Sequence, residues 1–366
     1  SLSNLEHNLN FLKSNLSPKT MMMAVVKASA YGSDSVIISK FLEKKSIDYF
    51  AVAYCREGIY LRKAGIKTPI LVLHPQTEDF ENILNFNLEP SIYSFRILDF
   101  FLKASKSFKN RAFQIKFNTG LNRLGFDEKD IEKLIIKLDN RLPKFIFSHL
   151  GASDDDKKDY TNNQIERFLA ISKKFDSLVN EPIKKHILNT SGILNFLDFQ
   201  FDMVRSGIGL YGFGNHIKFK KSLRPVIALK TIISQKHEIQ KGEYVGYNKG
   251  YKAKNATTIA TLPIGHADGI SRSYGHGKLR VLINGSLVPT IGNICMDMLM
   301  IDVTKIKCSE GDKVTIFDDK NFTADEMGNL TETISYEILT SISNRIKRSY
   351  GNYRYYSNKP IWFIKK

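Results

Sequence analysis

The chain has 366 residues, of which 42% are hydrophobic and 25% are charged. This composition is typical of a globular protein, and the length exceeds what one ordinary core organises, so we expect two domains. No apolar run reaches the ~20 residues of a membrane-spanning helix, and no secretory signal is visible at Ser1. We therefore expect no membrane partner.

The net charge of +17 calls for a test of the nucleic-acid interpretation. Polyanions bind basic surfaces because binding releases counterions. Here the lysines are spread along the whole chain, and no platform of arginines and aromatic residues recurs. We therefore favour a lysine-rich, solvated surface and no nucleic-acid partner, while noting that a positive field also attracts small anions.

Three cysteines, Cys55, Cys295 and Cys308, have neither paired nor metal-type spacing. This pattern is typical of reduced thiols and predicts a cytoplasmic protein.

Short apolar runs alternate with amphipathic stretches up to about residue 208. The runs predict strands at intervals of ~20–40 residues: 22–27, 49–53, 69–73, 90–93, 113–117, 144–149, 186–189 and 203–208. The stretches between them predict helices, among them 35–44, 56–64, 128–138 and 163–178. Eight such units predict a (β/α)₈ TIM barrel over residues 1–225, with its active site at the carboxyl ends of the strands.

The pattern changes after Pro225, and residues 226–366 predict a second, mostly-β domain. Asn284 and Gly285 between two apolar segments are a strong hairpin signal. A helical element is expected around residues 336–348, and we assign no role to the tail from Ser349 to Lys366.

Lys27 is the most informative residue of the first domain. It follows the continuously apolar residues 21–26 and precedes a turn that contains Tyr31. A lysine at the exit of a buried strand is costly unless it is used, and a partly desolvated amine is a good nucleophile for Schiff-base chemistry. Taken alone, a lysine at a strand end usually reaches solvent, but the motifs that follow favour the catalytic interpretation.

Two cations flank a polar turn in residues 115–126, namely Lys116 and Arg123. Taken alone, this segment is an ordinary loop with incidental charges. At the same edge of a barrel as Lys27, the two cations would suit an acidic ligand.

Glycines follow the last expected barrel strand. Arg205 ends that strand, and Gly207 and Ile208 come next, while Asn189 and Thr190 end the preceding strand. Glycines here let backbone amides turn toward an anion, so we expect a phosphate site rather than a simple turn.

The second domain carries three loop motifs: GYNKGY, TLPIGHADG and GNICMDML. Tyr251 ends the first motif, where its ring would project into a cleft, and Asp297 beside Met296 would orient a hydroxyl or a cation. His266, Asp268 and Asp297 fit no standard metal spacing, so no metal is expected.

Together these segments resemble the alanine racemase family, from about Asn8 to Arg348. The resemblance rests on the order of AVVKASAYG, IKFNTGLNRLGF, FSHLGASDD, HILNTSG, MVRSGIGLYG, PIGHADG and GNICMDM. Several stretches are most similar to the racemase module that some bacteria carry fused behind a muramyl-peptide ligase, which would fit a chain that begins abruptly. The resemblance implies interconversion of L- and D-alanine for peptidoglycan precursors, with pyridoxal 5'-phosphate as cofactor, by a homodimer with shared active sites.

The resemblance also implies the roles of the central residues. Lys27 corresponds to the lysine that holds the cofactor and acts as one base, and Tyr251 to the opposite base, supplied by the partner subunit. Arg205 corresponds to the arginine at the pyridine nitrogen. His149 corresponds to the histidine that links this arginine to the tyrosine.

Further residues follow from the same resemblance. The cofactor phosphate and its surroundings are implied at Tyr31, Asn189, Thr190, Gly207 and Ile208. The substrate pocket is implied at Arg123 and, from the partner chain, at Met296 and Asp297, while Lys116 corresponds to a lysine that is often carbamylated.

Three positions depart from the family pattern. Asn344 stands where we expect many members to have a tyrosine that touches the phosphate, His266 replaces a tyrosine, and Asn118 replaces a common aspartate. These departures put one phosphate contact and the substrate range in question.

Three alternatives remain at this point. A broader amino-acid racemase would use the same residues with a different pocket. A decarboxylase of the same fold would use Lys27, but it does not need Tyr251 as a base, and it needs an acidic group where Arg205 stands. A non-enzymatic cofactor-binding protein would consist of the barrel alone, which the complete second domain disfavours.

Overall fold

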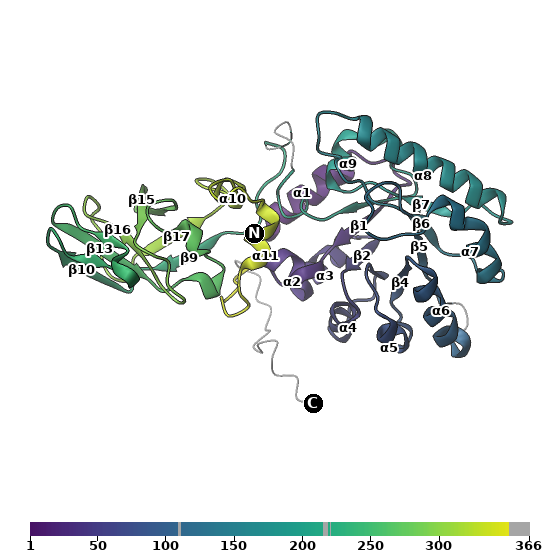
Figure 1. Cartoon of the computed structure of the whole chain (residues 1–366), viewed down its shortest axis with the longest axis horizontal. Coiled ribbons are helices and arrows are strands. Elements are labelled where there is room, and N and C mark those ends of the chain that lie inside the picture. Colours follow the sequence, from purple (N-terminus) through teal and green to yellow (C-terminus); the bar gives the residue numbers. More distant parts are fainter. Residues whose placement is uncertain (109–110, 215–218, 220, 351–366) are drawn as a thin grey trace.

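The structure, a computed structural model, describes residues 1–108, 111–214, 219 and 221–350. Most of the C-terminal tail therefore lies outside the described residues. Figure 1 shows an elongated molecule with a barrel at one end and a β domain at the other. The N-terminus and the yellow helix α11 (Ser335–Ser341) lie between the two parts.

Eight short parallel strands form the barrel: β1 Met21–Val25, β2 Tyr49–Val52, β3 Ile70–Val72, β4 Glu89–Ile92, β5 Gln114–Lys116, β6 Phe145–Phe147, β7 Lys184–His186 and β8 Met203–Ser206. The sheet order is β7-β6-β5-β4-β3-β2-β1-β8. Backbone hydrogen bonds from Asp202 N to Lys185 O (3.2 Å) and from Arg205 N to Leu188 O (3.0 Å) join its two end strands. The sheet therefore closes on itself, and the predicted (β/α)₈ barrel is confirmed.

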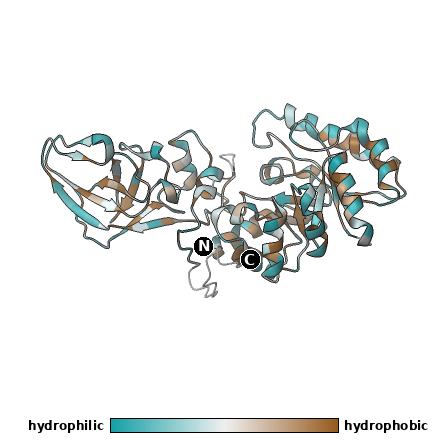
Figure 2. Cartoon of the chain, turned by 60° about the horizontal axis from the view of Figure 1, so that its bottom comes forward, coloured by the Kyte–Doolittle hydropathy of each residue, from teal (hydrophilic) through white to brown (hydrophobic). Residues whose placement is uncertain are grey.

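The helices of this part are α1 Leu2–Ser14, α2 Lys27–Gly32, α3 Ser35–Lys44, α4 Cys55–Lys63, α5 Phe80–Asn85, α6 Phe95–Ala104, α7 Ile131–Leu138, α8 Asp159–Ser177 and α9 Thr190–Asn195. The helix predicted at 35–44 matches α3, which begins where the Asp34 carboxylate accepts hydrogen bonds from Val36 N and Ile37 N. Figure 2 shows hydrophobic residues concentrated on the strands and on the helix sides that face them. The patterns at 35–44, 56–64, 128–138 and 163–178 thus predicted α3, α4, α7 and α8.

Several predicted boundaries were wrong in detail, as two of them illustrate. The strand expected at 186–189 is β7, which ends at His186, because Asn189 already caps helix α9 by accepting a hydrogen bond from Gly192 N. The helix expected over 128–138 starts as a 3₁₀ turn at Glu128–Asp130 before α7 begins.

The second sheet is antiparallel, with the order β10-β13-β16-β15-β14-β17-β9. Its strands are β9 Leu229–Ile232, β10 Gln235–Ile239, β13 Thr257–Leu262, β14 Arg280–Ile283, β15 Ser286–Ile291, β16 Leu299–Asp302 and β17 Lys313–Phe317, and β11 Tyr244–Val245 pairs separately with β12 Tyr251–Lys252. Asn284 and Gly285, both with positive φ, turn β14 into β15, so the predicted hairpin is confirmed. The exact domain division at residues 225 and 226 stays a prediction.

The helical element expected around 336–348 is shorter than predicted. After α10 (Ala324–Asn329), helix α11 ends at Ser341, because Ile342 adopts an extended ψ of 113°. The segment that follows is held instead by Arg348, whose guanidinium donates hydrogen bonds to carbonyl oxygens of Ile342 and Ser343.

Helix α11 packs against α2, the turn that follows Lys27. Gly32 makes this approach possible, because a Cβ atom there would lie 1.9 Å from Leu339 O. Arg348 reinforces the contact by donating to Gly32 O at 2.9 Å. The second domain thus supports the turn that carries the candidate lysine.

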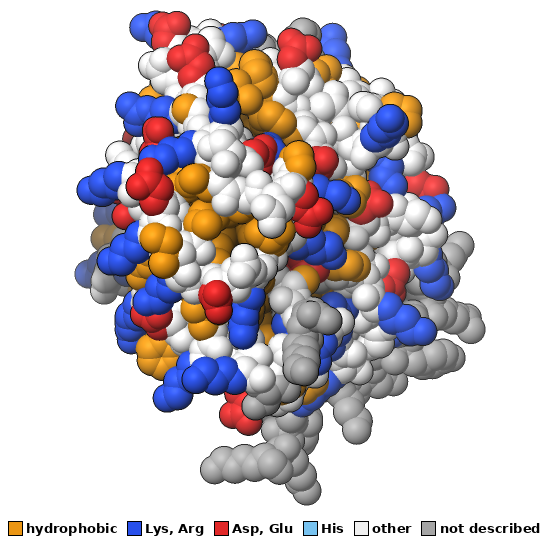
Figure 3. All heavy atoms as spheres, turned by 90° about the vertical axis from the view of Figure 1, so that its right-hand side faces the viewer, with side chains coloured by type: hydrophobic (Ala, Val, Ile, Leu, Met, Phe, Trp, Pro, Cys, Tyr) orange, Lys and Arg blue, Asp and Glu red, His pale blue; other side chains and the backbone are white. Residues whose placement is uncertain are grey.

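The surface charges and the thiols agree with the expectations from sequence. On the face of the barrel drawn in Figure 3, cationic side chains are interspersed with acidic ones rather than gathered in one patch. The three cysteines are free, as predicted. Within the described ranges, no helix has the length and apolarity that crossing a bilayer demands. The cytoplasmic location stays a prediction.

The junction predicts a large effect of Gly32→Ala. Gly32 has a φ of +78° and would clash with Leu339 O, whereas Gly65 has a φ of +91° with nothing within 4 Å. We expect Gly65→Ala to lower the free energy of unfolding by about 1–2 kcal/mol. Gly32→Ala should add an overpacking cost of about 1–3 kcal/mol. Urea titrations of the two variants measure the difference, and equal losses would contradict this account of the junction.

Candidate active site

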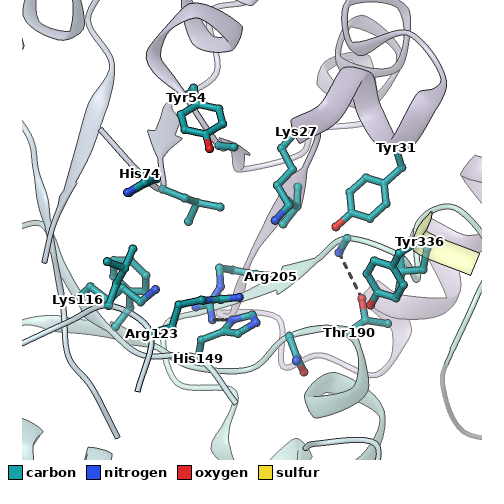
Figure 4. A pocket seen from close by; sticks show the side chains of 18 residues that line it. Lys27, Tyr31, Tyr54, His74, Lys116, Arg123, His149, Thr190, Arg205 and Tyr336 are labelled. Atoms are coloured by element: carbon teal, nitrogen blue, oxygen red, sulfur yellow. Dashed lines mark hydrogen bonds between the residues drawn. The ribbon is translucent and has the colours of Figure 1, made fainter. Parts of the chain in front are cut away.

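A cavity of about 670 Å³ opens at the carboxyl ends of the barrel strands, within the size range of small-molecule sites. Figure 4 shows its lining side chains. All ten barrel residues predicted for the site line this cavity: Lys27, Tyr31, Lys116, Arg123, His149, Asn189, Thr190, Arg205, Gly207 and Ile208.

Lys27 enters the cavity from an unusual turn. Residues 28–31 form a left-handed helical turn, with φ of 53–55° and ψ of 43–56°. Such a conformation costs roughly 1–2 kcal/mol per residue for L-amino acids, so the surroundings must impose it. The Glu57 carboxylate helps by accepting a hydrogen bond from Ala28 N at 2.7 Å. The turn directs both Lys27 and Tyr31 into the cavity (Figure 4).

The surroundings make the two lysine amines of this cavity easier to deprotonate. Burial lowers the pKa of Lys27, and the charge of Arg123 lowers it further, while Glu57 acts in the opposite direction. Burial also lowers the pKa of Lys116 to about 8, with added repulsion from Arg123 and Arg205. Both amines therefore lose a proton more readily than an exposed lysine does.

Arg205 is a fixed cation at the centre of the site. It is 4% exposed, and its Nη2 donates to Ser148 O at 2.7 Å and to Ile187 O at 2.9 Å. The same nitrogen lies 3.1 Å from Nδ1 of His149, and Nη1 contacts Nδ1 of His186. Burial lowers the pKa of Arg205 to about 9, so the guanidinium keeps its charge at neutral pH.

The two histidines act as neutral acceptors for this arginine. Burial and the charge of Arg205 hold the pKa of both His149 and His186 well below the ordinary value. A neutral imidazole can accept a hydrogen bond from the guanidinium, whereas an imidazolium would repel it.

The opposite end of the cavity is lined by hydroxyl groups and backbone amides. Tyr31 stacks on Tyr211 with ring centroids 4.5 Å apart. A Cβ at position 207 would lie 2.2 Å from the Tyr31 hydroxyl, so only glycine lets this hydroxyl approach the loop. The backbone amides of Gly207 and Gly209 donate to Thr190 Oγ1 at 3.3 and 3.2 Å. Hydroxyls and amides therefore converge at this end.

Sequence analysis missed Tyr336, which lines the cavity from α11 with its ring centroid 5.9 Å from that of Tyr31. Asn344, expected at a phosphate-contacting position, is exposed and is not among the lining residues. We therefore correct that expectation, because Tyr336, rather than residue 344, lies beside Tyr31 in the cavity (Figure 4). Tyr54 and His74 were also missed, although each follows a barrel strand and that position was a usable signal.

The residues predicted on the second domain do not reach this cavity within one chain. Tyr251 begins β12 and packs against Val245 and Met300, and Met296 and Asp297 line a separate hollow. Asp297 pairs with Arg345 at 2.7 Å. One chain therefore does not bring Tyr251 to Lys27.

Exposed apolar side chains surround the separate hollow. Met296 is 59% exposed, Tyr247 72% and Tyr244 48%.

Over the part of the chain that the structure describes, no group of three or more His, Cys, Asp or Glu residues is arranged to hold a metal ion.

Comparisons with known proteins agree with this geometry. Two family models match the chain, "Alanine racemase, N-terminal domain" over residues 1–214 and "Alanine racemase, C-terminal domain" over residues 226–350. Alanine racemase 1 of Clostridium acetobutylicum is 36% identical over 370 residues, which cover 95% of this chain and 93% of the relative.

Solved structures give the same result. The alanine racemase of Clostridium difficile 630 has a TM-score of 0.90 and 33% identity, covering 95% of this chain and 93% of its own. The same racemase in complex with cycloserine has a TM-score of 0.87 at the same identity and coverage. The chain therefore belongs to the alanine racemase family.

Proposed function

We propose that this protein is an alanine racemase that interconverts L- and D-alanine for peptidoglycan precursors, with pyridoxal 5'-phosphate as its cofactor. The observation that carries the proposal is one cavity that contains a lysine with a lowered pKa and a buried, charged arginine. The membership in the family supplies the reaction. Kinship with a racemase module fused to a muramyl-peptide ligase stays a prediction.

The residues present fit this cofactor. Lys27 would hold it covalently through its amine, and the amides of Gly207 and Ile208 with the hydroxyls of Tyr31 and Thr190 would bind its phosphate. Gly207 supports this assignment, because a Cβ atom at this position would fill the space beside the Tyr31 hydroxyl. Tyr336 would close the phosphate end from α11. When bound, the cofactor supplies an electron sink for the substrate carbanion.

Two residues would move the proton. Lys27 would take or return it on one face of the substrate, and Tyr251 of the partner subunit on the other. A single base would have to swing across the substrate plane, whereas each positioned base contributes ~10²–10⁴-fold. A partner is needed because Tyr251 is absent from the cavity of its own chain. The exposed apolar side chains beside Met296 support such a contact.

Arg205 distinguishes racemisation from the decarboxylase alternative. Its positive charge would disfavour a proton on the pyridine nitrogen, because adjacent positive charges repel. This weakens the sink and discourages side reactions that need a long-lived carbanion. His149 would connect Arg205 to the partner subunit's tyrosine, and Arg123 would bind the substrate carboxylate.

The first test is cofactor-loaded racemisation over a panel of amino acids, read by chiral chromatography. We expect a yellow protein with alanine as its best substrate. Lys27→Ala should abolish the colour and lower the rate by at least ~10²-fold. Lys103→Ala, on the exposed side of α6, is the matched control and should leave both unchanged. A protein that cannot be loaded would refute the cofactor assignment, and equal rates across the panel would favour the broader racemase.

The second test addresses the shared site. Lys27→Ala and Tyr251→Phe should each be inactive, with Tyr251→Phe slowing proton exchange of one enantiomer far more than of the other. After subunit exchange in an equal mixture, half the dimers are hybrids with one intact site, so about a quarter of wild-type activity should return. No recovery despite verified exchange would contradict a site built from two chains.

The third test concerns Lys116. A carbamate forms from a neutral amine and carbon dioxide, and a pKa of about 8 makes that amine accessible near neutral pH. We propose that this carbamate would hold Arg123 by charge. Protein equilibrated with ¹³C-labelled carbon dioxide should show a carbamate signal by NMR, lost in Lys116→Met. A signal that persists in this variant would assign the modification elsewhere.

A further inference from the structure

A chain of buried polar side chains runs from Arg205 through the barrel interior. The guanidinium contacts Nδ1 of His186, whose Nε2 lies 2.9 Å from Gln114 Oε1. Gln114 Nε2 donates to Glu89 Oε2 at 2.9 Å, and Lys144 pairs with Glu89 Oε1 at 3.1 Å. Arg205 lines the cavity at the carboxyl ends of the strands, whereas His186, Gln114 and Glu89 do not.

These positions are unusual for polar residues. Glu89 and Gln114 begin β4 and β5, and His186 ends β7. The hydrogen-bonded series therefore extends from the beginnings of the barrel strands to their carboxyl ends. Glu89 is 7% exposed, and Gln114 and His186 are 0% exposed. Barrel interiors are usually filled by apolar side chains, and a buried polar chain is tolerated only when every member is satisfied.

The chain has a direction. Glu89 receives hydrogen bonds from Lys144, Gln114 and the Tyr49 hydroxyl, as an ionised carboxylate would. Because the carboxylate only accepts, the amide NH₂ of Gln114 must face it, and Gln114 Oε1 must face His186. His186 then carries its proton on Nε2 and presents a bare Nδ1 to Arg205.

Packing leaves His186 little freedom to escape this arrangement. Its ring is stacked on Phe147 at 4.7 Å, with an interplanar angle of 9°, and meets Phe145 edge-on at 5.5 Å. The stacking fixes the ring plane, and a half-turn that restores this plane would break the hydrogen bonds at both ring nitrogens. The position of the proton, rather than ring rotation, therefore decides what Arg205 meets.

We propose that Glu89 and Gln114 are positioning residues that set the His186 tautomer and thereby hold Arg205 in place against the cofactor's pyridine nitrogen. The link to the pyridine rests on the proposed function, whereas the control of the tautomer does not. Glu89, separated from the cavity-lining Arg205 by the side chains of Gln114 and His186, would thus influence the reaction through three hydrogen bonds.

The test is Glu89→Gln in the full-length protein. Lys144 can only donate, and it contacts the same oxygen, Oε1, as the Tyr49 hydroxyl, so the new amide oxygen should take that position and its NH₂ should face Gln114. Gln114 must then turn its own NH₂ toward His186, whose proton should move to Nδ1 and oppose Arg205. ¹⁵N chemical shifts of labelled histidine, assigned by loss of the signal in His186→Asn, report the tautomer with and without pyridoxal phosphate.

A second readout follows the cofactor. ¹⁵N-labelled pyridoxal phosphate should change its ring-nitrogen shift in Glu89→Gln, and kcat should fall about tenfold with KM changed less than about twofold. The double variant Glu89→Gln with Gln114→Glu exchanges the two side chains. A carboxylate at position 114 then places an accepting oxygen next to His186 Nε2 again. The double variant should restore the wild-type tautomer, the cofactor signal and most of kcat.

Tyr49→Phe is the matched control, because it removes a hydrogen bond to the same carboxylate without reversing the chain. It should keep the wild-type signals. The proposal would be overturned by an unchanged His186 tautomer in Glu89→Gln, or by a changed tautomer that leaves the cofactor signal and kcat unchanged. Effects of Tyr49→Phe equal to those of Glu89→Gln would also overturn it. Failure of the wild-type protein to bind pyridoxal phosphate would refute the proposed function. The histidine signals would still show whether Glu89 and Gln114 set the His186 tautomer.

Discussion

The buried charge of Arg205 is the constraint on which the candidate site depends. An isolated guanidinium in a barrel interior would be prohibitively unfavourable. Here two carbonyl oxygens and two neutral histidines accept its hydrogen bonds. Because all of these partners come from strands β6 and β7 or the residues that follow them, the charge is fixed to the barrel rather than to a mobile loop. A fixed charge can act on the electronic state of a bound ring, which a solvated arginine would not do reliably.

The second domain stabilises the strained part of the same site. The left-handed turn after Lys27 is unfavourable on its own, and α11 packs against it where Gly32 allows close approach. The same helix brings Tyr336 into the cavity beside Tyr31. The second domain therefore has a role within its own chain. It also completes the cavity to which its own barrel contributes Lys27.

Much of this could be predicted from sequence because the signals are local. Apolar runs and amphipathic stretches predicted the barrel, and Lys27 and Arg205 were found because each lies at or just after the end of a strand. Tyr336 was missed because its place depends on the packing of α11 on α2, which joins residues about 300 positions apart. The left-handed turn was missed because Ala28, Ser29 and Ala30 carry no local signal for it. Glu89 and Gln114 were missed because attention to the carboxyl ends of strands overlooks inward-facing residues at their beginnings.

The charges around the cavity also constrain what it can hold. Among the described residues that line it are Lys27, Lys116, Arg123 and Arg205, but no aspartate or glutamate. Two unit charges 4 Å apart at an effective dielectric constant of about 20 interact by about 4 kcal/mol, so several cations in one cavity repel strongly. This repulsion contributes to the lowered pKa of Lys27 and of Lys116, and bound anions would relieve it. A phosphate at the Tyr31 end and a carboxylate near Arg123 would provide such anions at opposite ends of the cavity. The cavity is therefore complementary to an anionic cofactor together with an amino acid, and a neutral ligand would leave its cations uncompensated.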